Sequence, residues 1–354
     1  MKKYFEDLMY GRRRSLLVGL FLSMLAFVYR SALSVRDAWY SFPWTRKVLP
    51  CKVISVGNIT IGGTGKTPAV IDVAALLLRN GKHPVVISRG YGRPDESSLA
   101  VVSDGLNVQN DTVANGDEPV LIAARLTGVP VVVGSDRYRA ARFALERFAS
   151  DVVVLDDGFQ HRRLGRDCDI VLVDASDPFG NGKLFPAGIL REQLSALRRA
   201  HVILITRSES GADNQSLRSV LHRYTAAPIF TSSHVPLDLT NVITNETRPL
   251  SSLRGARALA FSGIARPSAF QALLETLGVQ IRAARIYPDH HAYDKADLAD
   301  IFQQAADEKV NMIITTEKDA VRLKTLRPEG IWALRIRLKV VEADEWEQML
   351  AGII

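Results

Sequence analysis

The chain has 354 residues, 47% of them hydrophobic and 23% charged, with 24 Gly and 15 Pro. This composition excludes a disordered, collagenous or low-complexity protein, and the length predicts about two domains. The two cysteines, Cys51 and Cys168, lie far apart and outside any CxxC pattern, which argues against a disulfide framework or a structural zinc site and favours a reducing compartment. The net charge of +7 suggests an anionic partner: nucleic acid, a phosphate-bearing substrate or an acidic membrane face.

The first 47 residues predict a membrane anchor. Fifteen uncharged residues lie between Arg14 and Arg30, and as a helix they would reach about 22 Å, less than the roughly 30 Å hydrocarbon core of a bilayer. Cations flank this run on both sides, so the positive-inside rule gives no crossing direction. We therefore expect a monotopic anchor on the membrane surface, with interfacial aromatic residues at 39–44. A cleaved signal peptide and a buried helix are the alternatives.

From about residue 51 the chain is predicted to alternate strands and helices. Short apolar runs predict strands at residues 52–56, 84–87, 130–133, 152–155, 170–173 and 202–205. Helical patterns occur at residues 66–80, 118–126, 137–148 and 190–199. Because the strands are continuously apolar rather than alternating, they indicate a parallel sheet that is covered on both faces.

A second, smaller α/β series begins at residue 258. Strands are expected at 258–263, 280–286 and 311–316, with helices at 268–277 and 294–306. Two further strand-like runs, 229–242 and 331–341, could pair as a two-stranded connector. We therefore predict an α/β protein with a membrane-anchor helix and its flank at 1–47, a parallel-sheet domain at 48–228 and a second, smaller α/β domain at 229–354.

The string TIGGTGKT at residues 60–67 predicts a phosphate-binding P-loop, because it follows a strand and opens a helix. Backbone N–H groups of such a loop bind phosphate oxygens, Lys66 would reach the terminal phosphates, and the Thr67 hydroxyl would ligate Mg²⁺. Thr60 replaces Gly at the first position of GxxxxGK[ST]. A Gly-rich strand-to-helix turn without a ligand is the alternative. The predicted nucleotide-binding residues are Thr60, Ile61, Gly62, Gly63, Thr64, Gly65, Lys66 and Thr67.

Carboxylates occur at three other places where phosphoryl transfer would use them. Asp156 and Asp157 end an apolar strand, where either could hold the metal directly or through water; a turn that caps the strand is the alternative. Asp117 begins a predicted helix and could orient or deprotonate an acceptor, but helix capping explains the same pattern. Arg191 and Glu192 open another predicted helix, and a solvated first turn is at least as good an explanation.

Seven strings occur in chain order: SVGNITIGGTGKTP, RGYGR, NGDEP, DDGFQHRRL, PAGILRE, DHHAY and TTEKDA. With the short hydrophobic N-terminal helix, they resemble the tetraacyldisaccharide 4′-kinases, or lipid A 4′-kinases, over about residues 55–320. The resemblance implies a membrane-associated P-loop kinase with two α/β domains, on the cytoplasmic face of the inner membrane of a Gram-negative bacterium. Its reaction would move the γ-phosphate of ATP to the 4′-hydroxyl of a tetraacylated glucosamine disaccharide 1-phosphate.

The same resemblance implies roles for individual residues. Asp117 would be the catalytic base, and His290, which follows Asp289, would meet the active site from the second domain. Asp156, Asp157 and Glu192 would lie around the metal and the phosphates, with ATP and Mg²⁺ as cofactors. An acylated phosphoglycolipid stays in the bilayer, so its kinase needs an apolar foot and basic residues near anionic headgroups, and residues 1–47 offer both.

Two other classes remain as alternatives. A membrane-associated P-loop NTPase could act as a switch for a protein or metal-delivery partner. Such switches commonly recognise guanine through an [NT]KxD string after a late strand, and the string here is Thr206-Arg207-Ser208-Glu209, so adenine is favoured. A nucleic-acid-binding ATPase would use the positive charge, but RNP-like aromatic residues are missing and the basic residues are dispersed among acidic ones, so no nucleic-acid partner is expected.

Overall fold

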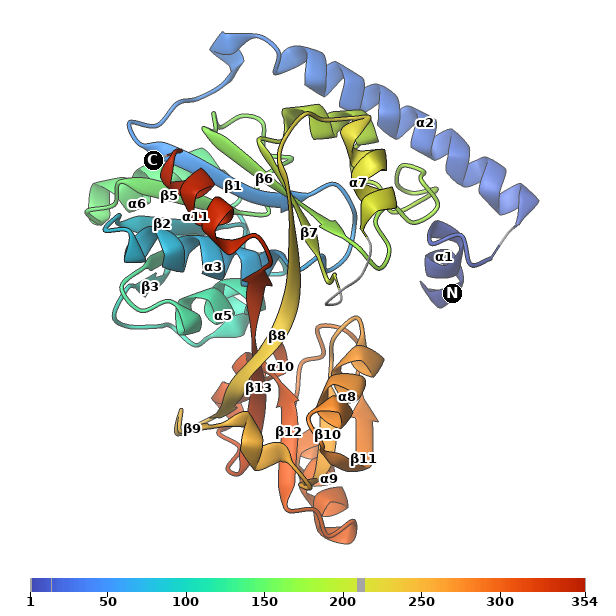
Figure 1. Cartoon of the computed structure of the whole chain (residues 1–354), viewed down its shortest axis with the longest axis vertical. Helices are drawn as coiled ribbons and strands as arrows, with labels where there is room; N and C mark the ends of the chain where they lie inside the picture. The colour runs from blue at the N-terminus through green and yellow to red at the C-terminus, as the bar shows by residue number, and fades with distance from the viewer. Residues whose placement is uncertain (1, 14, 209–213, 354) are drawn as a thin grey trace. The chain divides into compact units, whose positions relative to one another are not determined.

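The structure is a computed structural model that describes residues 2–13, 15–208 and 214–353, so Arg14 and Glu209 lie outside the described residues. The chain divides into two compact units (Figure 1). Unit 1 consists of Met1–Arg89, Gly134–Ser233 and Leu338–Ile354, and unit 2 of Gly90–Val133 and His234–Arg337. Residues 90–133 thus group with the later segment rather than with the P-loop, although the functional domain boundaries at 48–228 and 229–354 stay a prediction.

The sheet of unit 1 is parallel, as predicted. Its strands are β1 (Lys52–Asn58), β2 (Pro84–Ser88), β5 (Val152–Asp156), β6 (Cys168–Asp174), β7 (Val202–Thr206) and the first residues of β8 (Ile229–Asn241). They lie in the order β8-β7-β6-β1-β5-β2, and every neighbouring pair is parallel. Val56 of β1 pairs with Asp156 of β5. This register places the carboxyl end of β5 beside the start of the loop that follows β1.

Helices cover both faces of this sheet, which explains why its strands carry no polar alternation. The helical elements are α3 (Lys66–Arg79), α6 (Arg137–Arg147), η2 (Leu194–Arg199), α7 (Gln215–His222) and α11 (Ala343–Ala351). The helix predicted at 190–199 was wrong in its first turn: only a 3-10 helix over Leu194–Arg199 forms. Residues 190 and 191 are extended instead, because Leu190 bridges Thr60 and the N–H of Arg191 donates to the carbonyl of Ile59 at 2.7 Å.

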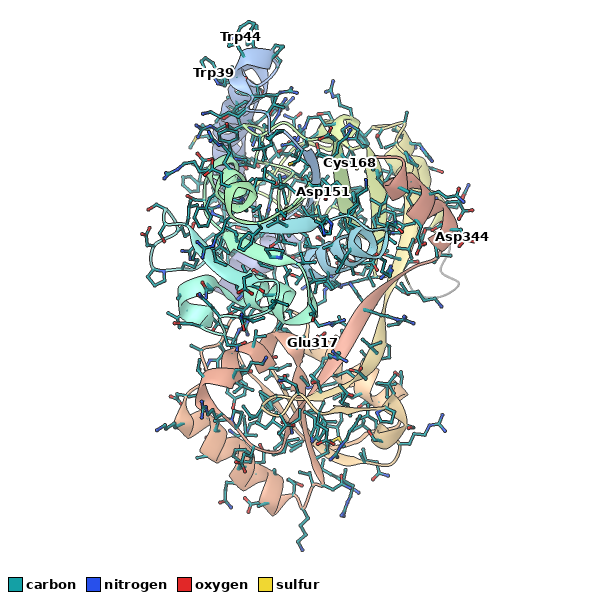
Figure 2. The ribbon with its side chains drawn as sticks, turned by 90° about the vertical axis from the view of Figure 1, so that its left-hand side faces the viewer. Trp39, Trp44, Asp151, Cys168, Glu317 and Asp344 are labelled. Carbon is teal, nitrogen blue, oxygen red and sulfur yellow. The ribbon has the colours of Figure 1, made fainter. Side chains whose placement is uncertain are left out.

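The N-terminal segment of unit 1 forms α1 (Lys2–Met9), α2 (Leu16–Trp39) and η1 (Pro43–Thr45). The 24 residues of α2 give a length of about 36 Å, so the helix extends beyond the uncharged run between Arg14 and Arg30. Near the end of this helix, Arg36 pairs with two acidic side chains, Asp37 and Glu192. By length and composition alone α2 could cross a membrane. Trp39 and Trp44 lie exposed together at its end (Figure 2).

Unit 2 contains a second parallel sheet and short antiparallel pairings. The parallel strands are β10 (Arg257–Ser262), β11 (Gln280–Ile286), β12 (Met312–Thr316) and β13 (Ile331–Val340), in the order β11-β10-β12-β13. The sequence missed β3 (Ala100–Asp104), which pairs antiparallel with β4 (Pro130–Val133). Short elements here are α4 (Thr112–Asn115), β9 (Thr247–Arg248), η3 (Leu250–Leu253) and η4 (Lys324–Leu326).

The longer helices of unit 2 are α5 (Asp117–Arg125), α8 (Pro267–Thr276), α9 (Lys295–Asp307) and α10 (Glu317–Leu323). Alternate residues of β10 face different cores: Phe261 packs with α9, and Ala260 packs with α8. β8 and β13 are neighbours, as predicted. The N–H of Val242 donates to the carbonyl of Ile331 and that of Val341 to Thr231, so the two runs are antiparallel.

Candidate active site

The loop between β1 and α3 has the backbone that the P-loop prediction requires. Gly62 (φ 105°) and Gly65 (φ 87°) are left-handed, a conformation that favours glycine. Thr60 has no positive φ, so the loop does not need glycine at that position. The side chain of Thr60 is buried, and Asn58 Nδ2 donates to its carbonyl at 2.9 Å and to its hydroxyl at 3.3 Å. The departure from the consensus is therefore accommodated locally.

Backbone and side-chain hydrogen bonds from outside the loop support it. The N–H of Ile61 donates to the carbonyl of Ile189 at 2.7 Å, and the hydroxyl of Thr206 donates to the carbonyl of Thr64 at 2.8 Å. Among the described residues, none hydrogen-bonds the buried hydroxyl of Thr64. A buried hydroxyl without a partner costs free energy that a bound oxyanion would recover. This unpaired group fits a loop that binds phosphate.

Lys66 and Asp157 contact each other at the start of α3. Lys66 Nζ lies 3.8 Å from Asp157 Oδ1 and donates to Asn58 Oδ1 at 3.3 Å. Arg191 Nη1 donates to both oxygens of Asp157, at 2.9 and 2.8 Å. Burial of Asp157 disfavours its charged form, but Lys66 and Arg191 outweigh that effect and hold its pKa below the usual range. The carboxylate is thus kept ionised beside the predicted phosphate-binding loop.

Oxygen donors suited to a hard cation lie at the same edge of the sheet. Asp156 is buried at the end of β5 and accepts a hydrogen bond from the Ser88 hydroxyl at 2.8 Å. Thr67 is buried in the first turn of α3. In the part of the chain that the structure describes, no three His, Cys, Asp or Glu side chains form a group that could hold a metal. Mg²⁺ usually takes only one or two carboxylates, with phosphates and waters completing its shell, so this donor set fits it.

Glu192 is placed differently from the sequence prediction. Its side chain is only 2% exposed, so the interpretation as a solvated first turn was wrong. Arg199 donates to Oε2 at 2.6 Å, and Arg36 of α2 lies 3.0 Å from Oε1 without hydrogen-bond geometry. Glu192 therefore forms an ion-paired cluster that holds α2 within unit 1. Its predicted position at the metal stays a prediction.

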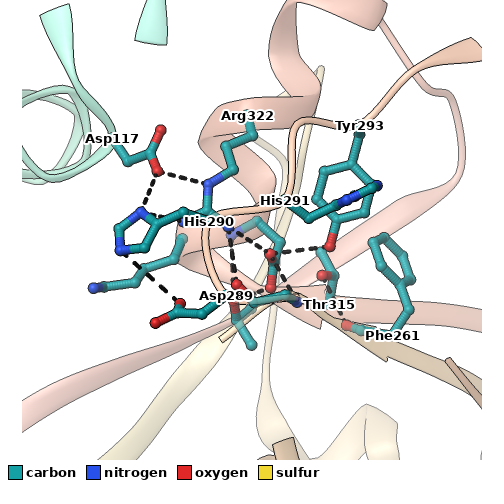
Figure 3. Close-up of polar contacts among 12 residues, drawn as sticks. Asp117, Phe261, Asp289, His290, His291, Tyr293, Thr315 and Arg322 are labelled. Atoms are coloured by element: carbon teal, nitrogen blue, oxygen red, sulfur yellow. Dashed lines mark hydrogen bonds and ion pairs between the residues drawn. The ribbon is translucent and has the colours of Figure 1, made fainter. Parts of the chain in front are cut away.

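In unit 2, Asp117 lies beside His290, as Figure 3 shows. Asp117 is the first residue of α5, but Gly116 (φ 87°) is the N-cap, and no side chain caps this helix. Asp117 Oδ2 instead accepts a 2.7 Å hydrogen bond from Arg322 Nε and lies 3.1 Å from His290 Nδ1. The capping explanation for Asp117 was therefore wrong, because its carboxylate is used in long-range contacts.

The contact between Asp117 and His290 shifts their pKa values in opposite directions. Burial of Asp117 disfavours its ionised form, but the hydrogen bond from His290 and the charge of Arg322 outweigh it and lower the pKa of Asp117. The hydrogen bond to Asp117 raises the pKa of His290 above its usual value, although burial opposes this. The pair therefore favours a carboxylate next to an imidazolium.

Sequence reasoning missed Arg322 and the two residues that support it, Asp319 and Tyr293. Arg322 Nη1 donates to Asp319 Oδ1 at 3.1 Å, and the Tyr293 hydroxyl donates to the same oxygen at 3.0 Å. Tyr293 and Asp319 lie inside the strings DHHAY and TTEKDA, and Arg322 follows the second string by two residues. The signal available was the i, i+3 spacing of Asp319 and Arg322 on one short helix, which predicts an ion pair but not its contact with Asp117.

Comparisons with known proteins identify the family of this chain. The family model described as Tetraacyldisaccharide-1-P 4′-kinase matches residues 18–354. A tetraacyldisaccharide 4′-kinase of Syntrophus aciditrophicus is 42% identical over 346 residues, covering 94% of this chain and 92% of the relative. One of Pelobacter propionicus is 41% identical over 349 residues, covering 96% and 94%.

A solved structure is similar over the same length. The crystal structure of LpxK from Aquifex aeolicus in complex with ATP has 30% sequence identity and a TM-score of 0.78. The similarity covers 95% of this chain and 99% of that chain. The predicted α/β fold with its P-loop domain and second α/β part is confirmed. The family model and these relatives span nearly the whole sequence, and the chain therefore belongs to the tetraacyldisaccharide 4′-kinase family.

Proposed function

We propose that this protein is an ATP-dependent kinase of lipid A biosynthesis, which phosphorylates the 4′-hydroxyl of a tetraacyl glucosamine disaccharide 1-phosphate. The observation that carries the proposal is the family match over residues 18–354. The related crystal structure in complex with ATP supports ATP as the phosphoryl donor. The phosphate-binding loop at residues 60–67 supplies a matching site in this chain.

The loop and the first turn of α3 bind the triphosphate. Backbone N–H groups of residues 60–67 bind phosphate oxygens, and the Thr64 hydroxyl gains an acceptor. Lys66 exchanges its contact with Asp157 for the terminal phosphates. Thr67, Asp156 and Asp157 would hold Mg²⁺, which when bound neutralises charge on the phosphate oxygens. A direct ligand role for Glu192 would require it to leave Arg36 or Arg199.

Asp117 acts as the base toward the acceptor. As the 4′-oxygen forms its bond to the γ-phosphorus, its proton passes to the Asp117 carboxylate, and the bond from that phosphorus to the bridging oxygen breaks to release ADP. His290 donates to Asp117 and fixes its orientation. Because phosphoryl transfer has a loose transition state, holding the groups in place contributes more than the strength of the base.

The proposal is tested with purified protein, γ-labelled ATP and a panel of phosphoglycolipids that differ in acylation and in the anomeric phosphate. We expect the label to appear on the tetraacyl disaccharide 1-phosphate. Label that appears only as free phosphate, at a rate that no glycolipid changes, would instead support an NTPase switch for a protein or metal-delivery partner.

We further propose that α2 lies on the cytoplasmic surface of the inner membrane, with an anionic lipid face as its partner. Its outer face is apolar and exposed, at Leu16, Leu17, Leu20, Phe21, Met24, Phe27, Val28 and Val35. The opposite side packs on the rest of unit 1, since the Tyr29 hydroxyl donates to the carbonyl of Arg191 at 2.9 Å and Arg36 pairs with Glu192. A helix held along one side in this way suits surface attachment better than a crossing.

The double variant Phe21→Asp/Phe27→Asp is expected to weaken membrane binding. Burying one such side chain contributes about 1.5–3 kcal/mol, so losing two should lower vesicle affinity by more than about 10-fold. Co-sedimentation with anionic phospholipid vesicles measures this. Leu106→Asp is the control, because Leu106 is also a large exposed hydrophobic residue but lies in unit 2. Unchanged binding of the double variant would contradict attachment through α2.

A further inference from the structure

We propose that Arg322 is a positioning residue for the transfer reaction: it holds Asp117 through Oδ2 and thereby leaves Oδ1 as the oxygen that takes the proton of the acceptor hydroxyl. The inference rests on the proposed role of Asp117 as the base. It adds to that role the identity of the reacting atom and the side chain that aims it.

The two oxygens of Asp117 are bonded differently. Arg322 Nε donates to Oδ2 at 2.7 Å, and His290 Nδ1 lies 3.1 Å from the same oxygen. Figure 3 shows both contacts converging on one side of the carboxylate. Over the described residues, no hydrogen bond reaches Oδ1. The side chain is 18% exposed, and Oδ1 is not among the buried unpaired atoms of the described residues, so Oδ1 is the oxygen open to an incoming hydroxyl.

Arg322 is better fixed than His290. The Arg322 side chain is 5% exposed, whereas the His290 side chain is 48% exposed and sits in a loop at φ 62°. Arg322 Nη1 is bound to the carbonyl of Gly263 at 3.0 Å and to Asp319 Oδ1 at 3.1 Å. Its Nη2 lies 3.3 Å from His290 Nδ1. One guanidinium thus ties Asp117 to the core of unit 2 and lies next to His290.

Asp319, which pairs with Arg322, is fully buried. Asp319 accepts hydrogen bonds at Oδ1 from the Gly263 N–H and from the Tyr293 hydroxyl, both at 3.0 Å, and at Oδ2 from Thr316 at 2.6 Å. A Cβ at Gly263 would lie 3.0 Å from the carbonyl oxygen of Pro288, so the backbone approaches closely here. These contacts exist before any substrate binds, which is what preorganisation of a reacting group requires.

The charges around Asp117 lower its basicity but fix its orientation. Arg322 and His290 face the carboxylate, with Asp289 and Glu118 acting on His290. A permanent cation at 2.7 Å makes Asp117 a weaker base, but it orients Oδ1. The 4′-hydroxyl proton moves to Oδ1 as the new O–P bond forms and ADP departs. For a loose transition state the gain in orientation outweighs the loss in basicity.

The test compares Arg322→Gln and Arg322→Lys in the full-length enzyme, with kcat, KM for ATP and the pH dependence of kcat/KM as readouts. Arg322→Gln should lower kcat by about 10- to 100-fold with KM for ATP unchanged. The acidic limb of its pH profile for kcat/KM should move to higher pH, because the loss of the cation raises the pKa of Asp117. Arg322→Lys should restore the position of the limb but only part of kcat, since lysine keeps the charge without the planar fork.

Arg335→Gln is the matched control, because Arg335 also forms an ion pair with an aspartate, Asp238, in unit 2 but does not contact Asp117. The acidic limb of the pH profile of Arg335→Gln should stay in place. If Arg322→Gln merely lowers the melting temperature, with parental kcat and an unmoved limb in the folded protein, the proposal is wrong.

A second readout separates failure of this inference from failure of the base assignment. ¹³C-carboxyl NMR of aspartate-labelled enzyme, with the Asp117 signal assigned by its loss in Asp117→Asn, reports the pKa of Asp117 without turnover. Arg322→Gln should raise that pKa, and an unchanged pKa would overturn the proposed role of Arg322. Full activity of Asp117→Asn together with a raised pKa in Arg322→Gln would reject the base but retain the contact.

Discussion

Lys66→Ala is expected to abolish phosphoryl transfer while leaving the fold intact. Lys66 Nζ is held by Asn58 Oδ1 at 3.3 Å and by Asp157 at 3.8 Å, at the first residue of α3. That placement delivers a cation to the terminal phosphates, where charge accumulates in the transition state. A cation in such a position contributes on the order of 10³-fold or more to the rate, so little activity should remain.

The measurement is labelled-phosphate transfer to the lipid, with thermal melting and ATP binding recorded in parallel. Lys52→Ala is the matched control, because Lys52 is also in unit 1 and near an aspartate, Asp167, at 3.4 Å, but it is half-exposed and far along β1 from the loop. The control should retain the parental rate. Parental activity in Lys66→Ala would place the nucleotide site elsewhere in the chain.

Asp117→Asn and His290→Ala are expected to slow transfer with little effect on ATP affinity. Loss of a general base typically lowers kcat by about 10²- to 10⁴-fold. The loss of a helix cap, which would cost ~1 kcal/mol of stability, does not apply because Gly116 is the N-cap. Glu118→Gln is the matched control: it removes a carboxylate from the same helical turn, one that pairs with Lys318 and acts on His290 only through its charge. Its kcat should stay near the parental value.

The double variant tests whether Asp117 and His290 act as a pair. Once Asp117 is gone, removal of His290 should change kcat by much less than it does in the parent, since contacting residues are not additive. Strictly additive effects, or near-normal kcat in a destabilised Asp117→Asn protein, would argue against the pair. A titration gives a further sign: because Asp117 raises the pKa of His290, Asp117→Asn should let His290 lose its proton at a lower pH.

The sequence by itself determined the parts of this protein that depend on local patterns. Continuous apolar runs identified β1, β5, β6 and β7, because a strand buried on both faces has no polar side. The string at residues 60–67 identified the loop before α3, since glycine and lysine at fixed spacing meet a requirement of the local backbone. The resemblance of seven strings then led to the family, which the comparisons confirmed.

Tertiary structure alone decided which side chains meet across long separations. Asp117 and Arg322 are 205 residues apart, and no periodicity in either segment encodes their contact. Residues 190–191 are extended because they pair with residues 59–60, so the helical turn that the sequence predicted does not form. Glu192 then faces Arg36 of α2. Propensity is local, whereas the partner of a buried charge is chosen by packing and by the need to pair that charge away from water.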